Sequence, residues 1–275
     1  MPHKFRRILA LARLLVLDGL RRHALLGLIA LSLAAEAGGL LFFDFVSRDI
    51  GRASSDFVIS IAWITGFIFL FFHAVQVMAL DEERRVIYSL VARPISRGEY
   101  VLGIFTGLAF LLFLLNFLLG GLGLGTLLLI KGMVAPVYFS HLSLGAFLLA
   151  WTGLFTMQLM LLAVILLFSG LIRGNFPVLL VSLSFYAICS GLPVVRESVA
   201  QKMTASVDLA RLSKLLLGLT AVFPDFHRLD FKNFIVAADS FPSLDLLLTG
   251  FGLALAYTTI FLWLAAVVYQ RRDLQ

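Results

Sequence analysis

The stretch DEERRVIYSLVARPISRGEY, residues 81–100, separates two apolar runs, 57–80 and 100–129. Each run reaches the about 20 apolar residues that a helix needs to cross a bilayer. The stretch therefore predicts a polar turn between two membrane-crossing helices. In a chain made mostly of apolar residues it is also the best candidate for a surface that meets a soluble partner.

Composition places the whole chain in a membrane. Of its 275 residues, 61% are hydrophobic and 14% are charged, whereas a soluble domain carries about 25% charged residues. The mean hydropathy is +1.01. The net charge of +6 fits basic topology signals on the cytoplasmic side better than nucleic-acid binding. The single cysteine, Cys189, excludes an intrachain disulfide, and no metal site is expected.

Six segments satisfy the length and composition of a membrane-crossing helix. They are roughly 24–43, 57–80, 100–129, 143–171, 177–195 and 246–269. The chain is therefore predicted to be an all-α polytopic membrane protein with six transmembrane helices in a single domain, 1–275. Residues 81–99 form its main cytoplasmic loop, and residues 196–245 form a helical loop on the outer side.

Residues 3–22 mix basic and aliphatic side chains in a different pattern. At 100° per residue, Lys4, Arg7, Asp18, Arg21 and Arg22 fall on one face of a helix, and the opposite face is aliphatic. This pattern predicts an amphipathic helix lying in the membrane interface. A secretory signal peptide is the alternative, but the basic region is too long for one and recurs up to Arg22.

The distribution of Lys and Arg predicts the orientation. If the N-terminus is inside, most basic residues fall on inside segments, and the two short outside loops carry only Arg48, Arg52 and Lys131. Both termini are then cytoplasmic, as six crossings require. The long outer loop 196–245 balances its basic residues with acidic ones, and a loop of that length is a weak determinant of topology.

Within residues 81–100 the sequence predicts a helix, a stop, a cap and a second helix. Residues 86–91 carry an apolar stripe that is typical of a short amphipathic helix. Pro94 ends it, because proline disfavours a helical conformation at Arg93. Ser96 and Glu99 then match a capping box directly in front of the crossing that begins at Tyr100. The segment should form a rigid elbow that faces the cytoplasm.

The stretch EERRVIYSLVARPISRGEYVLG, residues 82–103, resembles the first cytoplasmic loop of type-two ABC transporter permeases. It is most similar to the branch labelled multi-copper-enzyme maturation permeases. The family pattern has a glutamate with basic residues, an aliphatic helix, Pro-Val/Ile-Ser-Arg, an aromatic residue and Leu-Gly-Lys. Ile104 stands where the family often has that lysine. The layout of the whole chain is also similar to that of the family.

The resemblance implies that this loop is a coupling helix that docks into a groove of a separate ABC ATPase subunit. The residues predicted to carry the coupling are Glu82, Glu83, Arg84, Arg85, Arg93, Pro94, Ser96 and Arg97. The chain has no phosphate-binding loop of its own, since the stretch from Gly125 to Gly132 fails that pattern in spacing and context. ATP and Mg would therefore bind the partner subunit, and this chain would bind no cofactor and would not be an enzyme by itself.

The resemblance also implies a dimer with a second permease copy, location in a bacterial inner membrane and export as the direction of transport. The alternative is a non-transporting membrane scaffold, such as an assembly factor for an envelope complex. A secondary carrier is disfavoured, because only Glu36 and His73 are ionisable within the predicted crossings.

Five polar residues lie within the predicted crossings, namely Glu36, His73, Gln76, Asn116 and Gln158. Each is a candidate for lining a substrate pathway or for a hydrogen bond between packed helices, and the second use is commoner. Glu36 stays open between a pathway role and a carboxyl group that reaches the outer interface. The motif Gly103-x3-Gly107 predicts close packing of another helix against the third crossing.

Overall fold

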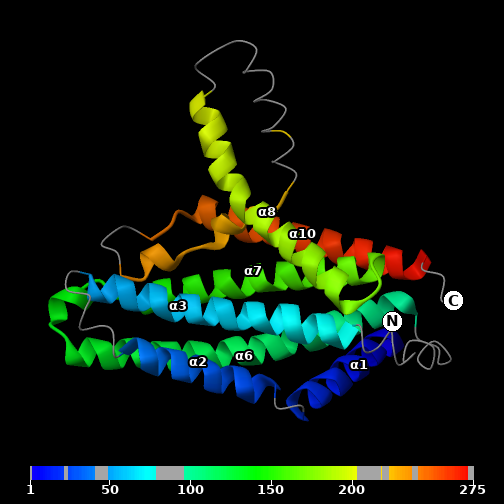
Figure 1. Cartoon of the computed structure of the whole chain (residues 1–275), viewed down its shortest axis with the longest axis horizontal. Coiled ribbons are helices and arrows are strands. Elements are labelled where there is room, and N and C mark those ends of the chain that lie inside the picture. The colour runs from blue at the N-terminus through cyan, green and yellow to red at the C-terminus, as the bar shows by residue number, and fades with distance from the viewer. Residues whose placement is uncertain are drawn as a thin grey trace.

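The computed structural model describes residues 2–21, 24–40, 49–78, 96–202, 218, 223–236 and 241–271. All regular structure in these residues is helical, and none of them forms a strand. Figure 1 shows α3, α6 and α7 as neighbouring long helices, with α1 and α2 on one side and α8 and α10 on the other. The described part of the chain is therefore all-α, as predicted.

Five helices are long and apolar enough to cross a membrane. They are Ile50–Met78, Arg97–Met133, Leu144–Leu171, Asn175–Val195 and Leu244–Arg271. The first comprises α3 (Ile50–Ile68), the π-helical η2 (Phe69–Ala74) and the residues up to Met78, and the others belong to α6 (Arg97–Met133), α7 (Leu144–Leu171), α8 (Asn175–Lys202) and α10 (Leu244–Arg271). They correspond to five of the six predicted crossings, and they make the chain a helical membrane protein.

The remaining predicted crossing, 24–43, is shorter in the structure. Its described part is α2 (Ala24–Leu40), which has 17 residues and a length of about 26 Å, below the about 30 Å of a hydrocarbon core. Residues 41–43 lie outside the described residues. The structure therefore supports five crossings by length, and α2 is an apolar helix that falls short of the sixth.

The two ends of the bundle carry different parts of the chain. The Ser96 end holds the start of α6 and the end of α10, and the start of α1 joins it, because Arg7 lies beside Glu99. The Asp49 end holds the starts of α3, α7 and α10. The first and last described helices thus meet at one end of the molecule, where Figure 1 marks both termini.

α1 (Pro2–Arg21) packs along the first half of α6. A Cβ atom built on Gly103 would lie 2.9 Å from Leu11 Cβ, and one built on Gly107 would lie 3.1 Å from the carbonyl oxygen of Ala12. The two glycines thus let the backbones approach closely, as the Gly-x3-Gly motif predicts. The sequence predicted an interfacial helix here. The structure shows that part of the aliphatic face of this helix packs on α6.

The core consists of two clusters along α6 and α7. Toward the Ser96 end, Phe69, Leu111 and Leu162 are fully buried with their neighbours. Toward the Asp49 end, Val58, Leu127 and residues of the segment 223–236 form the second cluster. α8 and α10 are largely exposed in the single chain, which is the pattern expected of helices that face lipid or another protein chain.

The segment 223–236 packs into the Asp49 end of the bundle as two short 3-10 helices, η4 (Phe226–Leu229) and η5 (Lys232–Phe234). Leu229 and Phe231 are buried against α7 at Gly153, where an added Cβ would lie 2.4 Å from the carbonyl oxygen of Leu229. Gly153 is nine residues beyond the start of α7, or about 14 Å along the helix. Part of the predicted outer loop therefore enters the bundle. Irregular backbone of this kind is tolerated at membrane depth only where it is buried in protein or lines a water-filled cavity.

α8 continues beyond the predicted end of the fifth crossing. The helix reaches Lys202, so the first seven residues of the predicted loop 196–245 are helical. Pro193 lies inside the helix and cannot donate a hydrogen bond to the carbonyl of Cys189. The C-terminal part of α8 projects away from the other helices (Figure 1). Residues 203–217, which complete most of the predicted helix on the outer face, lie outside the described residues.

Candidate functional site

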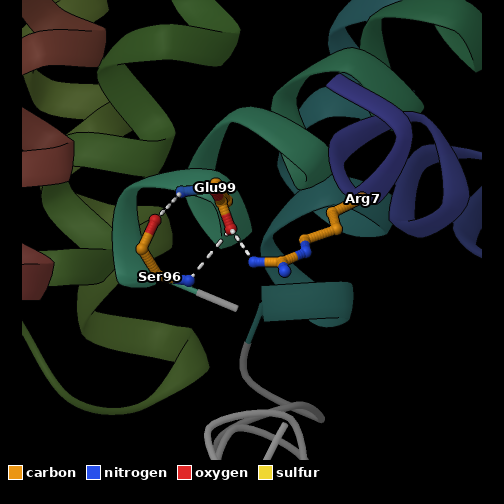
Figure 2. A network of polar contacts seen from close by, with 3 residues as sticks. All are labelled: Arg7, Ser96 and Glu99. Atoms are coloured by element: carbon orange, nitrogen blue, oxygen red, sulfur yellow. Dashed lines mark hydrogen bonds and ion pairs between the residues drawn. The ribbon is translucent and has the colours of Figure 1, made fainter. Parts of the chain in front are cut away.

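The residues that begin α6 form a compact polar network (Figure 2). The side-chain oxygen of Ser96 accepts a hydrogen bond from the N–H of Glu99 at 3.2 Å. Glu99 Oε2 in turn accepts one from the N–H of Ser96 at 3.0 Å. This is the capping box that the sequence predicted, and it is confirmed. It satisfies two backbone donors and fixes the direction in which the chain enters α6.

The same carboxylate links the cap to α1. Arg7 Nη1 lies 3.9 Å from Glu99 Oε2, and the Glu99 side chain is only 7% exposed. Figure 2 shows Arg7 reaching from α1 toward the network. One buried carboxylate therefore contacts both the chain that enters α6 and the N-terminal helix beside it.

Arg97 connects the start of α6 to the end of α10 by hydrogen bonds. Its Nη1 atom donates to the carbonyl oxygens of Tyr269 at 3.2 Å and Gln270 at 2.9 Å. The last carbonyls of a helix have no partner within the helix, so a guanidinium is a natural cap for them. The sequence predicted Arg97 for the coupling surface. The structure places its guanidinium on α10, and a role at a partner surface stays a prediction.

Tyr269 extends this connection to α7. Its hydroxyl group lies 3.1 Å from Ser169 Oγ, and its ring packs over Gly170, where an added Cβ would lie 2.8 Å from the ring. The ring of Tyr100 lies beside it, with centroids 6.2 Å apart. The start of α6 is therefore connected to α1, α7 and α10. We call Arg7, Ser96, Arg97, Glu99 and Tyr269 the entry cluster.

The other predicted coupling residues lie outside the described residues. They are Glu82, Glu83, Arg84, Arg85, Arg93 and Pro94. The structure describes the place where their segment joins α6, which is the entry cluster.

A second polar group lies midway along the bundle. Asn116 Nδ2 of α6 donates to Gln158 Oε1 of α7 at 2.7 Å, and both side chains are buried. The Gln158 amide lies against the backbone of α3, because a Cβ built on Gly66 would lie 2.0 Å from its Nε2 atom. Trp151 Nε1 donates to the carbonyl oxygen of Asn116 at 3.0 Å. Of the two predicted uses of Asn116 and Gln158, the structure supports the hydrogen bond between packed helices.

Two further polar pairs join α2 to the bundle, and sequence reasoning missed three of their four members. The hydroxyl groups of Ser32 and Thr65 lie 2.7 Å apart. Thr126 Oγ1 donates to Glu36 Oε2 at 2.9 Å, and Glu36 is 3% exposed. Ser32 and Glu36 are four residues apart and therefore share one face of α2. That spacing was the available signal in the sequence.

The last two predicted pathway residues differ in burial. His73 is 8% exposed and lies within the π-helical turn η2, with its ring 5.1 Å from that of Phe69. Gln76 is exposed on the helix that follows. π-helical turns are often found at functional sites, so His73 stays a candidate. Gln76 does not belong to the helix interface that surrounds His73.

Among the residues that the structure describes, no group of three or more His, Cys, Asp and Glu side chains could hold a metal ion. Among the described residues, the polar side chains that form hydrogen bonds between helices midway along the bundle are those of Ser32, Glu36, Thr65, Asn116, Thr126, Trp151 and Gln158. No protein-family model matches the chain, and no curated protein matches it.

Proposed function

We propose that this chain is the transmembrane subunit of an ABC transporter. It moves a substrate across the membrane with energy from ATP that a separate ATPase subunit hydrolyses. The chain works as a dimer, with a second copy or a related permease, bound to two ATPase subunits. ATP and Mg bind those subunits, and export is the direction that the resemblance implies.

The observation that carries the proposal is the entry cluster. The segment that resembles an ATPase-docking loop continues into α6 through a capping box, and the cluster connects that point to α1, α7 and α10. A helix that is pushed or pulled from outside needs a stiff attachment. The capped N-terminus of α6, which is connected to three other helices, provides such an attachment.

The proposal includes a topology. The Ser96 end faces the cytoplasm of a bacterial inner membrane, and both termini lie on that side. The meeting of α1 and α10 at the Ser96 end supports placing the two termini on one side. The basic residues of α1, which include Arg6, Arg7 and Arg13, support the cytoplasmic assignment, since Lys and Arg accumulate on that side.

Co-purification tests the proposal. The full chain is co-expressed in turn with each ATP-binding-cassette ATPase subunit encoded in the same genome, and vanadate-sensitive ATP hydrolysis is measured in lipid nanodiscs. Glu83→Ala and Arg93→Ala are expected to reduce both ATPase association and stimulated hydrolysis. Lys131→Ala is the matched control, because Lys131 is an exposed charge at the opposite end of α6. It should leave both quantities unchanged.

The outcomes separate the two functional classes. A complex whose hydrolysis falls with the 81–95 variants and not with the Lys131 variant supports the transporter. Association without any stimulated hydrolysis favours a membrane scaffold. Unchanged association and hydrolysis in both coupling variants would refute the assignment of the coupling loop.

A further inference from the structure

A cavity of about 400 Å³ lies between α3, α7, α8 and η4. The walls are mainly apolar, with Ile59 and Ile64 from α3, and Leu154 and Met157 from α7. The volume is in the range of about 300–1,000 Å³ that is usual for small-molecule sites. The polar part of the lining comes from Ser60, Ser190, His227, Asp230 and Lys232.

Three aromatic rings line one wall of this cavity. Tyr186 of α8 lies between Trp63 of α3, at a centroid distance of 5.7 Å, and Phe226 of η4, at 5.3 Å. Phe226 is 3% exposed and belongs to the segment 223–236. That segment therefore builds the cavity: η4 contacts both α7 and α8 and closes the space between them.

A second cavity of about 420 Å³ opens at the Asp49 end, and it is polar. Arg52, His141 and Asn233 line it, and Arg52 Nη2 donates to Asn233 Oδ1 at 3.3 Å. Lys232 lines both cavities, and its Nζ atom lies 3.7 Å from a carboxylate oxygen of Asp230. Among the described residues that line the polar cavity, Arg52 and Lys232 carry cationic side chains and Asp49 carries a carboxylate.

We propose that the two cavities together bind an amphiphile with an aliphatic chain and an anionic head group. The chain lies in the apolar cavity along the aromatic wall. The head lies in the polar cavity beside Arg52 and Lys232, and Lys232 marks the junction. This order matches a molecule that enters at the Asp49 end with its head at the membrane surface and its chain toward the bilayer centre.

The positions along α3 support this order. Arg52 lies near the start of α3, and Trp63 lies eleven residues, or about 16 Å, farther along. Polar and cationic groups thus occupy the surface end, and aromatic and aliphatic groups occupy the deeper end. The binding site goes beyond the proposed transport function and does not depend on it, because the walls belong to this chain alone.

Photolabelling tests the site. The full chain in nanodiscs of zwitterionic lipid is exposed to a diazirine-bearing C16 fatty acid, and the labelled residues are identified by mass spectrometry. Labels are expected on Trp63, Met157 and Tyr186. Ser60→Trp should abolish them, because Ser60 is an exposed residue that lines the cavity and an indole there fills it. Thr152→Trp, at an exposed position of α7 that lines neither cavity, is the matched control and should leave labelling intact.

The head group is tested with a neutral probe of the same chain, the C16 diazirine alcohol. Arg52→Gln and Lys232→Gln should each weaken labelling by the acid about two- to fivefold, as expected for a partly exposed ion pair. Labelling by the alcohol should not change. A diazirine-bearing phosphatidylglycerol in the same assay distinguishes a membrane phospholipid from a free fatty acid as the source of the anionic head.

Three results would overturn the proposal. One is labelling of the exposed face of α10, around Trp263, to the same extent as the cavity, which indicates surrounding lipid only. Another is labelling that persists in Ser60→Trp when that variant elutes as a single species like the wild type. The third is an equal effect of the charge variants on the acid and the alcohol. The proposal is supported if either anionic probe labels the cavity of the wild type and the Ser60→Trp variant loses this labelling.

Discussion

Ser96→Ala should destabilise the start of α6 by the free energy of one capping hydrogen bond. The substitution removes the oxygen that accepts from the Glu99 N–H at 3.2 Å, and it leaves the bond from the Ser96 N–H to Glu99 Oε2 at 3.0 Å. Loss of such a cap costs about 1 kcal/mol. Local opening that exposes the Glu99 amide should therefore become roughly fivefold more frequent.

Glu99→Gln tests the capping hydrogen bond separately from the ion pair with Arg7. Glutamine still reaches the Ser96 N–H and keeps the capping geometry, but it loses the attraction to Arg7. The Arg7 side chain is 38% exposed and 3.9 Å away, so water screens the pair and its energy is below about 1 kcal/mol. A double-mutant cycle of Arg7→Gln and Glu99→Gln should give a coupling of about 0.5 kcal/mol.

Hydrogen exchange of the full chain in nanodiscs measures these effects, read from peptides that cover 96–101. Ser143→Ala is the matched control, because Ser143 caps α7 at the Asp49 end by accepting from the Ala146 N–H at 3.3 Å. It should accelerate exchange at the start of α7 and leave 96–101 unchanged. If Ser96→Ala changes exchange at 96–101 no more than Ser143→Ala does, the capping box does not stabilise the entry to α6, and the reasoning fails.

Three further changes test the packing inside the bundle by the free energy of unfolding in mixed micelles. Gly107→Ala should destabilise the protein by about 1–3 kcal/mol because the added Cβ would meet the α1 backbone. Gly121→Ala should change stability by less than about 1 kcal/mol, because an added Cβ there has no atom within 4 Å. Equal effects of the two substitutions would contradict the close contact at Gly107. Gln158→Leu should cost about 1–3 kcal/mol because it removes the acceptor of Asn116, and an unchanged stability would show that this bond contributes little. Glu36→Gln keeps an acceptor for the Thr126 hydroxyl group and should change stability by less than about 0.5 kcal/mol. A larger loss of stability would show that the carboxyl group itself is required.

Features that depend on residues close in sequence could be predicted. The Ser96–Glu99 capping box is local, and its pattern of residue types three positions apart specifies it. The positions of five helices follow from apolar runs for the same reason, although α3 begins and α6 and α8 end outside the predicted bounds. Asn116 and Gln158 could be recognised singly as buried polar groups, because a polar side chain in an apolar helix seeks a partner. Their pairing could not, because it depends on how α6 lies against α7.

Features that depend on distant residues could not be predicted. Arg97 was predicted as a coupling residue, yet its guanidinium caps α10 at the carbonyl of Gln270, 173 positions later. The segment 223–236 reads as a surface loop, yet Gly153 and Gly250 open space for it within the bundle. Glycines in apolar helices suggest close packing, but they do not say which element approaches them. The cavity that this segment closes was therefore not foreseen.

The N-terminal region also depends on contacts between distant residues, because α1 and α2 pack along α6 one after the other. Arg7 meets Glu99, Gly19 meets Leu111 and Glu36 meets Thr126, at spacings of 92, 92 and 90 positions. A nearly constant spacing means that the two helices run parallel to α6 and share its length between them. The backbone of α1 approaches α6 closely between Ile8 and Ala12, which is about one turn, and contacts through side chains extend from Arg7 to Gly19, over about three turns. An amphipathic helix that merely rests on lipid could not transmit a displacement of Ser96. Because α1 packs on α6, we expect a displacement of α6 to displace α1 as well.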